Sequence, residues 1–407
     1  MQTSILNKPE ILSPAGDFSR LKFAIQYGAD AVYLAGDMFG MRTASKNFNR
    51  EELKAAVDYA HAEGVKVYVT VNSMPRSEQL PLLPDYIRYL DAIKVDAVIV
   101  ADMGVLTLVK REAPALPVHI STQTSIVNYE SARAWHSLGA DRIVLARELS
   151  LDEIITIREK TDKSLELEAF VHGAMCISYS GRCLLSNFMT GRDANRGNCA
   201  QACRWKYALM EEKRPGEYFP VYEDGETFIL NSKDMNMISH IPELVSAGIS
   251  SFKIEGRVKT EYYVATVTNA YRMALDAYFD GTYTRDGIWA DEVNKVSHRE
   301  YWTGFYFSDG IGQHYGDSTY IRDWDIIGIV EECDEAGNAI LLQKNRFFKG
   351  DSVELFSPLA KPIPFVLDYF ENDKGEMIEV APHPEMRVKI KLPASCPKNS
   401  FIRREVK

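Results

Sequence analysis

The feature that most constrains the fold of this chain is a regular alternation between short apolar runs and longer amphipathic segments over residues 10–280. Each run is rich in Val, Ile, Leu or aromatic residues and is bounded by Gly, Asp or Asn, as expected of strands buried on both faces. The runs are Glu10–Ser13, Ala31–Ala35, Lys66–Val71, Ala97–Ala101, Val118–Ser121, Arg142–Ala146, Leu165–Val171 and Ser251–Glu255. Helical patterns between them include Arg50–Glu63, Glu78–Ile93, Tyr129–Leu138 and Leu151–Lys160.

Eight strand–helix alternations over about 250 residues predict an α/β fold, a (β/α)₈ TIM-like barrel. A doubly wound open sheet has the same alternation and stays open as an alternative. A ninth apolar run, Thr227–Asn231, either belongs to a segment inserted after the seventh strand or is itself the eighth strand. We assign the barrel to residues 1–282 and the insertion to about 172–230.

The character of the sequence changes after residue 282. Residues 283–322 form a polar, aromatic connector, and short alternating runs separated by turn signals follow over residues 323–407. The runs are Ile326–Glu331, Ala339–Gln343, Ser352–Phe356, Met377–Val380 and Arg387–Lys391. This pattern predicts a small C-terminal all-β barrel.

Composition narrows the classes of protein to which the chain can belong. The 46% hydrophobic and 26% charged content is ordinary for a soluble globular protein, and the net charge of −10 argues against indiscriminate binding of nucleic acid. The amino terminus lacks the cationic start and apolar stretch of a signal peptide, and no apolar run approaches the ~20 residues that span a bilayer. We therefore expect a cytoplasmic protein with no membrane contact.

The cysteines give the strongest chemical signal. Four of the six lie in the segment 172–207, named the cysteine segment below, with the spacing C-x₆-C-x₁₅-C-x₃-C. They are Cys176, Cys183, Cys199 and Cys203. Four thiolates complete an iron–sulfur or a zinc site, and only the second pair resembles a zinc knuckle. We expect an iron–sulfur cluster, with zinc as the alternative and two disulfides as a third, because reducing compartments disfavour disulfides.

Polar residues follow the predicted strands, where the active site of a (β/α)₈ barrel forms. Asp17 and Asp102 suit helix N-caps, whereas a capping role explains Arg147, Glu255 and Arg257 poorly. The candidate substrate-binding residues at these strand ends are Gln123, Arg147, Glu148, His172, Lys233, Glu255 and Arg257. His172 and Cys176 also allow a Cys–His nucleophile, a weaker hypothesis beside three further cysteines.

The cysteine segment is also basic. Its cations are Arg182, Arg192, Arg196, Arg204 and Lys206, against one acid, Asp193. Arginine forks match phosphate oxygens, so these residues are candidate RNA contacts, although they also suit a role in tuning a tetrathiolate cluster. A second basic stretch near the C-terminus is Arg387, Lys389, Lys391, Lys398, Arg403, Arg404 and Lys407. It fits an RNA-binding face or the solvated edge of a barrel.

Protease and nucleotide-binding signatures do not appear in the sequence. It contains no GxSxG elbow, no HExxH zinc helix and no Walker loop, and no helical pattern follows GIGQHYG at 310–316. The sequence therefore shows no catalytic motif that would support a peptidase activity.

The chain closely resembles the collagenase-like peptidase family U32, of unassigned catalytic type. The resemblance rests on ILSPAG at 11–16, AVYLAG at 31–36, MRTASKNF at 41–48, STQTSIVN at 121–128, RIVLAREL at 142–149, FVHGAMCISYSGRCLLS at 170–186, NRGNCAQACRW at 195–205, LNSKDM at 230–235 and FKIEGRVKTEYY at 252–263. Within that family it looks most like the prephenate-dependent tRNA wobble-uridine hydroxylases, which help to make 5-hydroxyuridine.

That resemblance implies a [4Fe–4S] cluster on the four clustered cysteines, tRNA as partner, and prephenate as a small dianionic co-substrate. It also leaves room for a second related family protein as a partner. A dianion requires cationic forks, for which Arg42, Arg147 and Arg257 are candidates. A flipped base requires aromatic and polar walls, for which Tyr33 and Tyr179 are candidates, with Phe48. The alternatives are a peptidase or other hydrolase, and a non-catalytic iron–sulfur scaffold that docks on RNA or on a partner enzyme.

Overall fold

The computed structural model describes residues 7–41, 47–176, 178–180, 182–194, 197–205, 208–209, 216, 219–220, 232–307 and 320–406. Eight parallel strands form its main sheet: β1 (Glu10–Pro14), β2 (Ala31–Leu34), β3 (Lys66–Val71), β4 (Ala97–Val100), β5 (Val118–Ile120), β6 (Arg142–Val144), β7 (Glu166–Ala174) and β11 (Ser251–Ile254). Each strand pairs with the next, and β11 pairs in parallel with both β7 and β1. The sheet therefore closes on itself, which confirms the (β/α)₈ barrel and excludes the doubly wound alternative.

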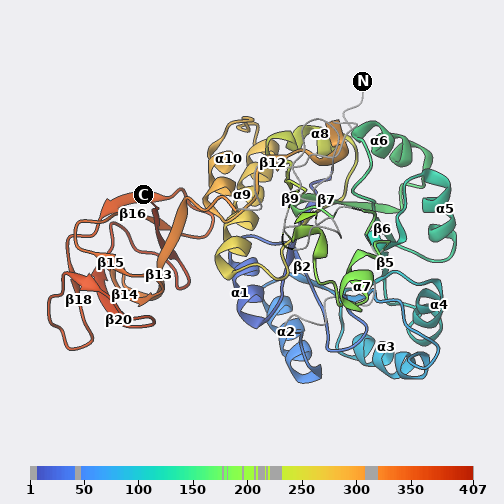
Figure 1. Cartoon of the computed structure of the whole chain (residues 1–407), viewed down its shortest axis with the longest axis horizontal. Coiled ribbons are helices and arrows are strands. Elements are labelled where there is room, and N and C mark those ends of the chain that lie inside the picture. Colours follow the sequence, from blue (N-terminus) through green and yellow to red (C-terminus); the bar gives the residue numbers. More distant parts are fainter. Residues whose placement is uncertain are drawn as a thin grey trace.

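Helices cover the outside of this barrel (Figure 1). They are α1 (Phe18–Gln26), α2 (Arg50–Ala62), α3 (Leu83–Ala92), α4 (Met103–Glu112), α5 (Tyr129–Ser137), α6 (Leu151–Lys160), α8 (Ile241–Ser246) and α9 (Glu261–Phe279). The predicted caps are confirmed, since the side chains of Asp17 and Asp102 accept hydrogen bonds from the backbone of the first turns of α1 and α4. Within the described residues, no helix combines the length and apolar character needed to cross a bilayer.

The interior of the barrel is polar at the end where the strands begin. Arg142 is almost fully buried there, and its guanidinium forms ion pairs with Glu10, Glu166 and Glu168. Lys253 binds the other carboxylate oxygen of Glu168 at 2.6 Å. Burial raises the pKa of the Glu10 carboxyl, but the charges of Arg142 and Lys66 and the hydrogen bonds from Arg142 and Ser251 together outweigh burial, so the net pKa is lowered. This ion network forms the floor of the barrel.

Additional strands extend the sheet beside β7. The short β10 (Asp234–Asn236) runs antiparallel to the end of β7, and β12 (Tyr301–Trp302) pairs in parallel with β10. Part of the predicted connector, with α10 (Ile288–Glu292), is therefore packed on the barrel. The ninth candidate strand, Thr227–Asn231, lies outside the described residues.

The C-terminal residues form a separate lobe, drawn in orange and red in Figure 1. Its strands are β13 (Trp324–Cys333), β14 (Asn338–Gln343), β15 (Phe347–Phe348), β16 (Ser352–Phe356), β17 (Ile363–Val366), β18 (Phe370–Glu371), β19 (Val380–Ala381), β20 (Arg387–Lys391) and β21 (Phe401–Glu405). Seven of them form an antiparallel sheet in the order β17-β16-β21-β13-β14-β20-β18 around its own apolar core. The predicted all-β unit is confirmed as a half-barrel.

One basic residue of the C-terminal tail joins this lobe to the barrel. Arg403 lies on the inner strand β21 with its side chain fully buried, and it forms ion pairs with Glu292 at 2.7 Å and Glu354 at 2.9 Å. Nearby, Phe401 stacks on Phe23 of α1. Arg403 is therefore a structural residue of the interface between lobe and barrel, and the expectation that this residue belongs to an RNA-binding face is wrong.

Candidate functional site at the barrel mouth

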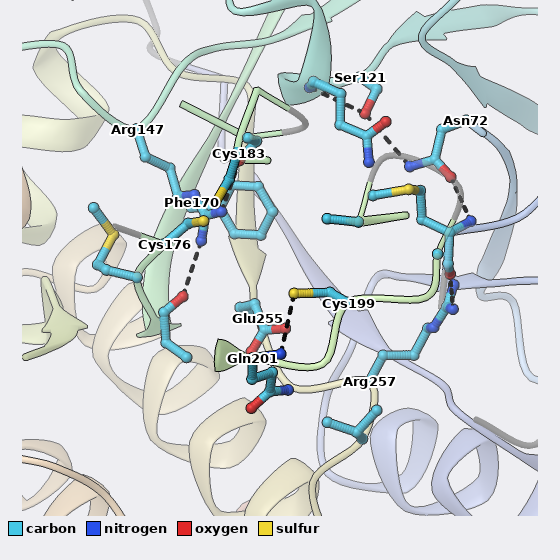
Figure 2. Close-up of a pocket in the computed structure, with 18 of the residues that line it drawn as sticks. Asn72, Ser121, Arg147, Phe170, Cys176, Cys183, Cys199, Gln201, Glu255 and Arg257 are labelled. Atoms are coloured by element: carbon cyan, nitrogen blue, oxygen red, sulfur yellow. Dashed lines mark hydrogen bonds between the residues drawn. The ribbon is translucent and has the colours of Figure 1, made fainter. Parts of the chain in front are cut away.

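A cavity of about 320 Å³ lies where the barrel strands end and the cysteine segment crosses them (Figure 2). Strand ends and the loops after them supply one part of its wall: Tyr33, Met41, Thr70, Asn72, Ile99, Ser121, Gln123, Arg147, Phe170, Lys253, Glu255, Arg257 and Val258. The cysteine segment supplies the rest: Ala174, Met175, Cys176, Ser180, Cys183, Leu185, Ser186, Ala194, Gly197, Cys199, Gln201, Ala202 and Cys203. The carboxyl ends of the strands are where barrel enzymes bind their substrates.

Among the described residues that line the cavity there are three cations, against one carboxylate, Glu255. Arg147 donates to the carbonyl oxygen of Ala174 at 2.9 Å and to the hydroxyl of Ser180 at 2.8 Å, so it holds the start of the cysteine segment in place. Arg257 donates to the hydroxyl of Thr70 and to the carbonyl oxygen of Met41.

The third cation, Lys253, lies over the ring of Tyr33, with its Nζ 4.7 Å from the ring centroid. Because Lys253 is also paired with Glu168, the net positive charge of the described lining comes from Arg147 and Arg257 against Glu255, and it suits an anionic ligand.

Amide and hydroxyl side chains form a polar wall on the side of β3 and β5. Asn72 accepts from the backbone of Met41 at 3.1 Å and donates to Ser121 at 3.5 Å, and the Ser121 hydroxyl accepts from the backbone of Gln123 at 3.4 Å. The wall thus combines fixed charges with neutral groups that both donate and accept. Such a combination suits a ligand with an anionic part and a polar ring.

All four clustered cysteines line this cavity, two exposed and two half-buried, and none of the four is in a disulfide. Figure 2 labels three of them around the cavity, and the Cys199 sulfur accepts a hydrogen bond from the backbone of Gln201. The described residues contain no group of three His, Cys, Asp or Glu side chains close enough to hold a metal ion. The donor set fits a tetrathiolate centre chemically, and the cysteine segment would have to draw the sulfurs together around it.

The structure gathers some of the predicted substrate-binding residues and not others. Gln123, Arg147, Glu255 and Arg257 line the cavity, and their roles stay predictions. Lys233 is paired with Glu300 at 3.1 Å away from the cavity. Glu148 does not line it, and burial raises the pKa of its carboxyl. Arg42 lies outside the described residues.

His172 is buried behind the cavity wall rather than in the cavity. Its ring nitrogens face the hydroxyls of Tyr271 and Tyr301 at 3.4 and 3.3 Å. The pairing of β7 with β11 explains this position, since Lys253 is opposite Phe170 whereas the next residue, Ile254, is opposite His172. The extra residue in β7 is a bulge, which turns the following side chain to the other face of the sheet.

Burial of His172 predicts a pH dependence of stability. Burial lowers the pKa of His172 to about 3 in the folded chain, whereas an unfolded histidine has a pKa of about 6.5. Between these two values the unfolded chain binds a proton at His172 and the folded chain does not, so acidification favours unfolding. We expect the wild type to lose more stability on acidification than His172→Gln, by up to about 1.4 kcal/mol per pH unit. Urea titrations from about pH 7 to 4.5 check this difference. His383→Gln, at an exposed position, should keep the wild-type slope; equal slopes for His172→Gln and wild type would contradict the prediction.

The candidate RNA contacts are described only in part. Arg182 and Arg192 are exposed, Arg196 and Lys206 lie outside the described residues, and nothing is described of the Arg204 side chain. The structure adds exposed apolar side chains on the same segment, notably Phe188 on α7 (Leu185–Thr190), which is 86% exposed. In the C-terminal tail, Arg387 pairs with Glu331 and Arg404 with Asp351.

The residue that our sequence reasoning missed is Lys253. It lies inside a predicted strand, where a lysine is unusual, and it alternates with Glu255 on the side opposite Phe252 and Ile254. A strand places alternate residues on opposite faces, so the assignment of Glu255 to the barrel mouth already implied that Lys253 points into the barrel. Its partner, Glu168, becomes evident only once β7 and β11 are paired.

Comparisons with known proteins find matches for both parts of the chain. The model of peptidase family U32 matches residues 16–314, and that of the U32 C-terminal domain matches residues 322–403. The chain is 40% identical to tRNA hydroxylation protein P1 of Bacillus subtilis, covering 95% of this chain and 93% of that protein. It is 36% identical to tRNA hydroxylation protein P of Escherichia coli, covering 92% of each. A 23S rRNA 5-hydroxycytidine synthase of Escherichia coli is 41% identical over 67% of this chain and 40% of its own length.

Proposed function

Because this chain belongs to peptidase family U32, and its relatives include proteins named for RNA hydroxylation, we propose that it is an RNA-hydroxylating enzyme. In its specific form, the proposal is a prephenate-dependent conversion of the tRNA wobble uridine to 5-hydroxyuridine. The observation that carries it is one cavity at the barrel mouth, where the described residues combine three cations, four cysteine thiols and a wall of neutral polar side chains.

The same cavity offers little to a peptidase. Among the described residues that line it there is no histidine, and the nearby His172 has both ring nitrogens turned to tyrosine hydroxyls. A nucleophilic cysteine needs a base within hydrogen-bond reach to form its thiolate and to protonate the leaving group. Four thiols around one cavity suit the ligands of a metal centre better than the nucleophile of a cysteine peptidase.

The co-substrate in this proposal is a small dianion such as prephenate. Arg147, Lys253 and Arg257 bind its carboxylates, because their cations line the cavity and two of them offer planar forks of donors. All three side chains are anchored by protein contacts, so they are positioned before the ligand arrives. This pre-organisation lowers the entropic cost of binding.

Hydroxylation at C5 breaks the C5–H bond of uracil and forms a C5–OH group. The base gains one oxygen atom and loses two electrons, so the oxygen donor must be reduced by two electrons in the same overall reaction. We assign that donor role to the dianionic co-substrate: one of its C–OH bonds breaks, its hydroxyl goes to C5, and hydrogen takes the place of the hydroxyl on the donor carbon, so that R–OH and uracil–H become R–H and uracil–OH. Cys176, Cys183, Cys199 and Cys203 would hold a [4Fe–4S] cluster, which supplies one-electron transfer when bound.

The outer face of the cysteine segment suits a single-stranded RNA loop. Arg182 and Arg192 are exposed there and match phosphate oxygens. Phe188 and Trp205 are exposed on the same segment, and exposed aromatic rings are platforms on which unpaired bases stack. A base leaving the anticodon loop would then enter the cavity that the inner face of the segment lines.

The proposal is tested by reconstitution and nucleoside mass spectrometry. Anaerobically purified, cluster-loaded protein with tRNA and prephenate should yield 5-hydroxyuridine, and omission of prephenate should reduce the yield to background. tRNA from a gene-deletion strain should lack the nucleoside until the wild-type gene is returned. Absence of hydroxylated uridine from cluster-loaded protein, or cleavage of gelatin by the protein without RNA, would favour the hydrolase alternative.

A further inference from the structure

An unsatisfied amide points to a recognition element in the cavity. Gln123 lines the cavity and is 5% exposed, yet its side-chain Oε1 is buried without a hydrogen-bond partner. Leaving such an acceptor unpaired costs about 1–3 kcal/mol, and folded proteins retain few of them. The amide therefore has unused hydrogen-bonding capacity beside the cavity, and a rotation of the side chain would present its oxygen to a ligand there.

The neighbours of Gln123 hold its backbone in place. The residue lies in the one-turn 3₁₀ helix Thr122–Thr124 that follows β5, and its backbone N–H donates to Ser121, which itself accepts from Asn72. Asn72 in turn accepts from Met41. Because the polar atoms of Asn72 and Ser121 are engaged with the protein, they support the turn, and the Gln123 side chain is left to face a ligand.

We propose that Gln123 determines base specificity by hydrogen-bonding the Watson–Crick edge of a uracil that has left its RNA stack. This inference rests on the proposed function and names a residue that selects the base. The amide oxygen accepts from N3–H, and the amide nitrogen donates to a neighbouring carbonyl oxygen of the base. An amide offers one acceptor beside one donor, which matches N3–H next to a carbonyl.

The same pairing discriminates against cytosine. Cytosine has an unprotonated N3, so the buried oxygen would meet a lone pair there. Cytosine could pair with the amide only if the amide turned over about its last bond, or if the base moved along the amide to offer its exocyclic amino group. That movement displaces C5 from the position it has in bound uracil. A site built to hydrogen-bond a substrate group rejects an analogue that lacks it far more strongly than an apolar pocket rejects a change of size.

The test uses anticodon stem-loop RNAs that carry uridine or 3-methyluridine at the wobble position. 3-Methyluridine lacks the N3–H donor, so the wild type should prefer uridine by about 100-fold in kcat/KM. In Gln123→Met, which keeps the length of the side chain, kcat/KM for uridine should fall by about 100-fold and the preference should shrink to within about 5-fold. This loss of discrimination is a readout that a merely destabilised cavity would not produce.

Gln343→Met is the matched control. Gln343 is also buried with an unpaired Oε1, but it lies on β14 in the C-terminal lobe. Its variant should keep both the wild-type kcat/KM and the wild-type preference. If the wild type is active and Gln123→Met retains the preference for uridine, the inference on Gln123 is overturned and the proposed function stands. If cluster-loaded wild type hydroxylates no RNA, the proposed function and the inference fail together.

Discussion

Cys203→Ser is expected to purify without an iron–sulfur cluster and to lose RNA hydroxylation by at least about 100-fold, because losing a metal ligand costs more than the 10–100-fold typical of a change beside one. Cys203 lines the cavity with the other three thiols of the cysteine segment. A serine hydroxyl is a poor substitute for a thiolate at neutral pH, since it stays protonated. The same loss is expected for Cys176→Ser, Cys183→Ser and Cys199→Ser.

Iron and sulfide analysis checks this prediction independently of activity. About four irons and four sulfides per chain are expected for the wild type and far fewer for each variant, in line with a [4Fe–4S] cluster. Cys333→Ser is the control, because Cys333 is a free thiol on β13, in the C-terminal lobe. Zinc in place of iron would support the zinc alternative. Unchanged iron in all four variants would remove these cysteines as ligands.

The second large effect is expected from the floor of the barrel. We expect Arg142→Met to lower the free energy of unfolding by about 3–5 kcal/mol, the range for removing one partner of a buried ion pair. Glu168 is fully buried and Glu10 nearly so, and both form ion pairs with the Arg142 guanidinium. Methionine fills much of the volume of the arginine but carries no charge. Glu10 then loses its ion pair with residue 142, and Glu168 keeps only its ion pair with Lys253.

Urea titration followed by circular dichroism measures the loss. Arg111→Met is the control, because the exposed Arg111 pairs with Glu112 at the surface and should cost less than about 1 kcal/mol. Arg142→Lys keeps the charge but loses the planar fork, so its cost should be intermediate. It also provides a readable variant if Arg142→Met does not fold. An Arg142→Met chain as stable as Arg111→Met would refute this account of the network.

The barrel was predictable because its signals are local. Each strand is a short apolar run between turn residues, and the number of strands and the length of the chain favour a closed barrel over an open sheet. Strands of the C-terminal lobe were harder to predict. Ile363–Val366 contains a proline and is an edge strand. Phe401–Glu405 has only two apolar residues, followed by three charged ones, so its sequence does not show the apolar run typical of a strand.

Charge was a poor guide to exposure at single positions. Arg403 belongs to a basic tail in the sequence, yet it is buried because Glu292 and Glu354, far away in the chain, meet its guanidinium. Lys253 is buried for a similar reason, since Glu168 on β7 reaches it. In both ion pairs the partners are far apart in the sequence, so inspection of neighbouring residues does not show them.

The sequence by itself determined the order of the strands, the presence of a second all-β lobe and the position of four thiols on one segment beyond the seventh strand. These properties depend on residue type and on spacing along the chain, which the sequence states directly. Only the tertiary structure decided which side chains share the cavity: it placed Lys253 there and, through one extra residue in β7, turned His172 away. Strand register and bulges are set by pairing between residues about 80 positions apart, and a one-residue shift moves a side chain to the opposite face of the sheet.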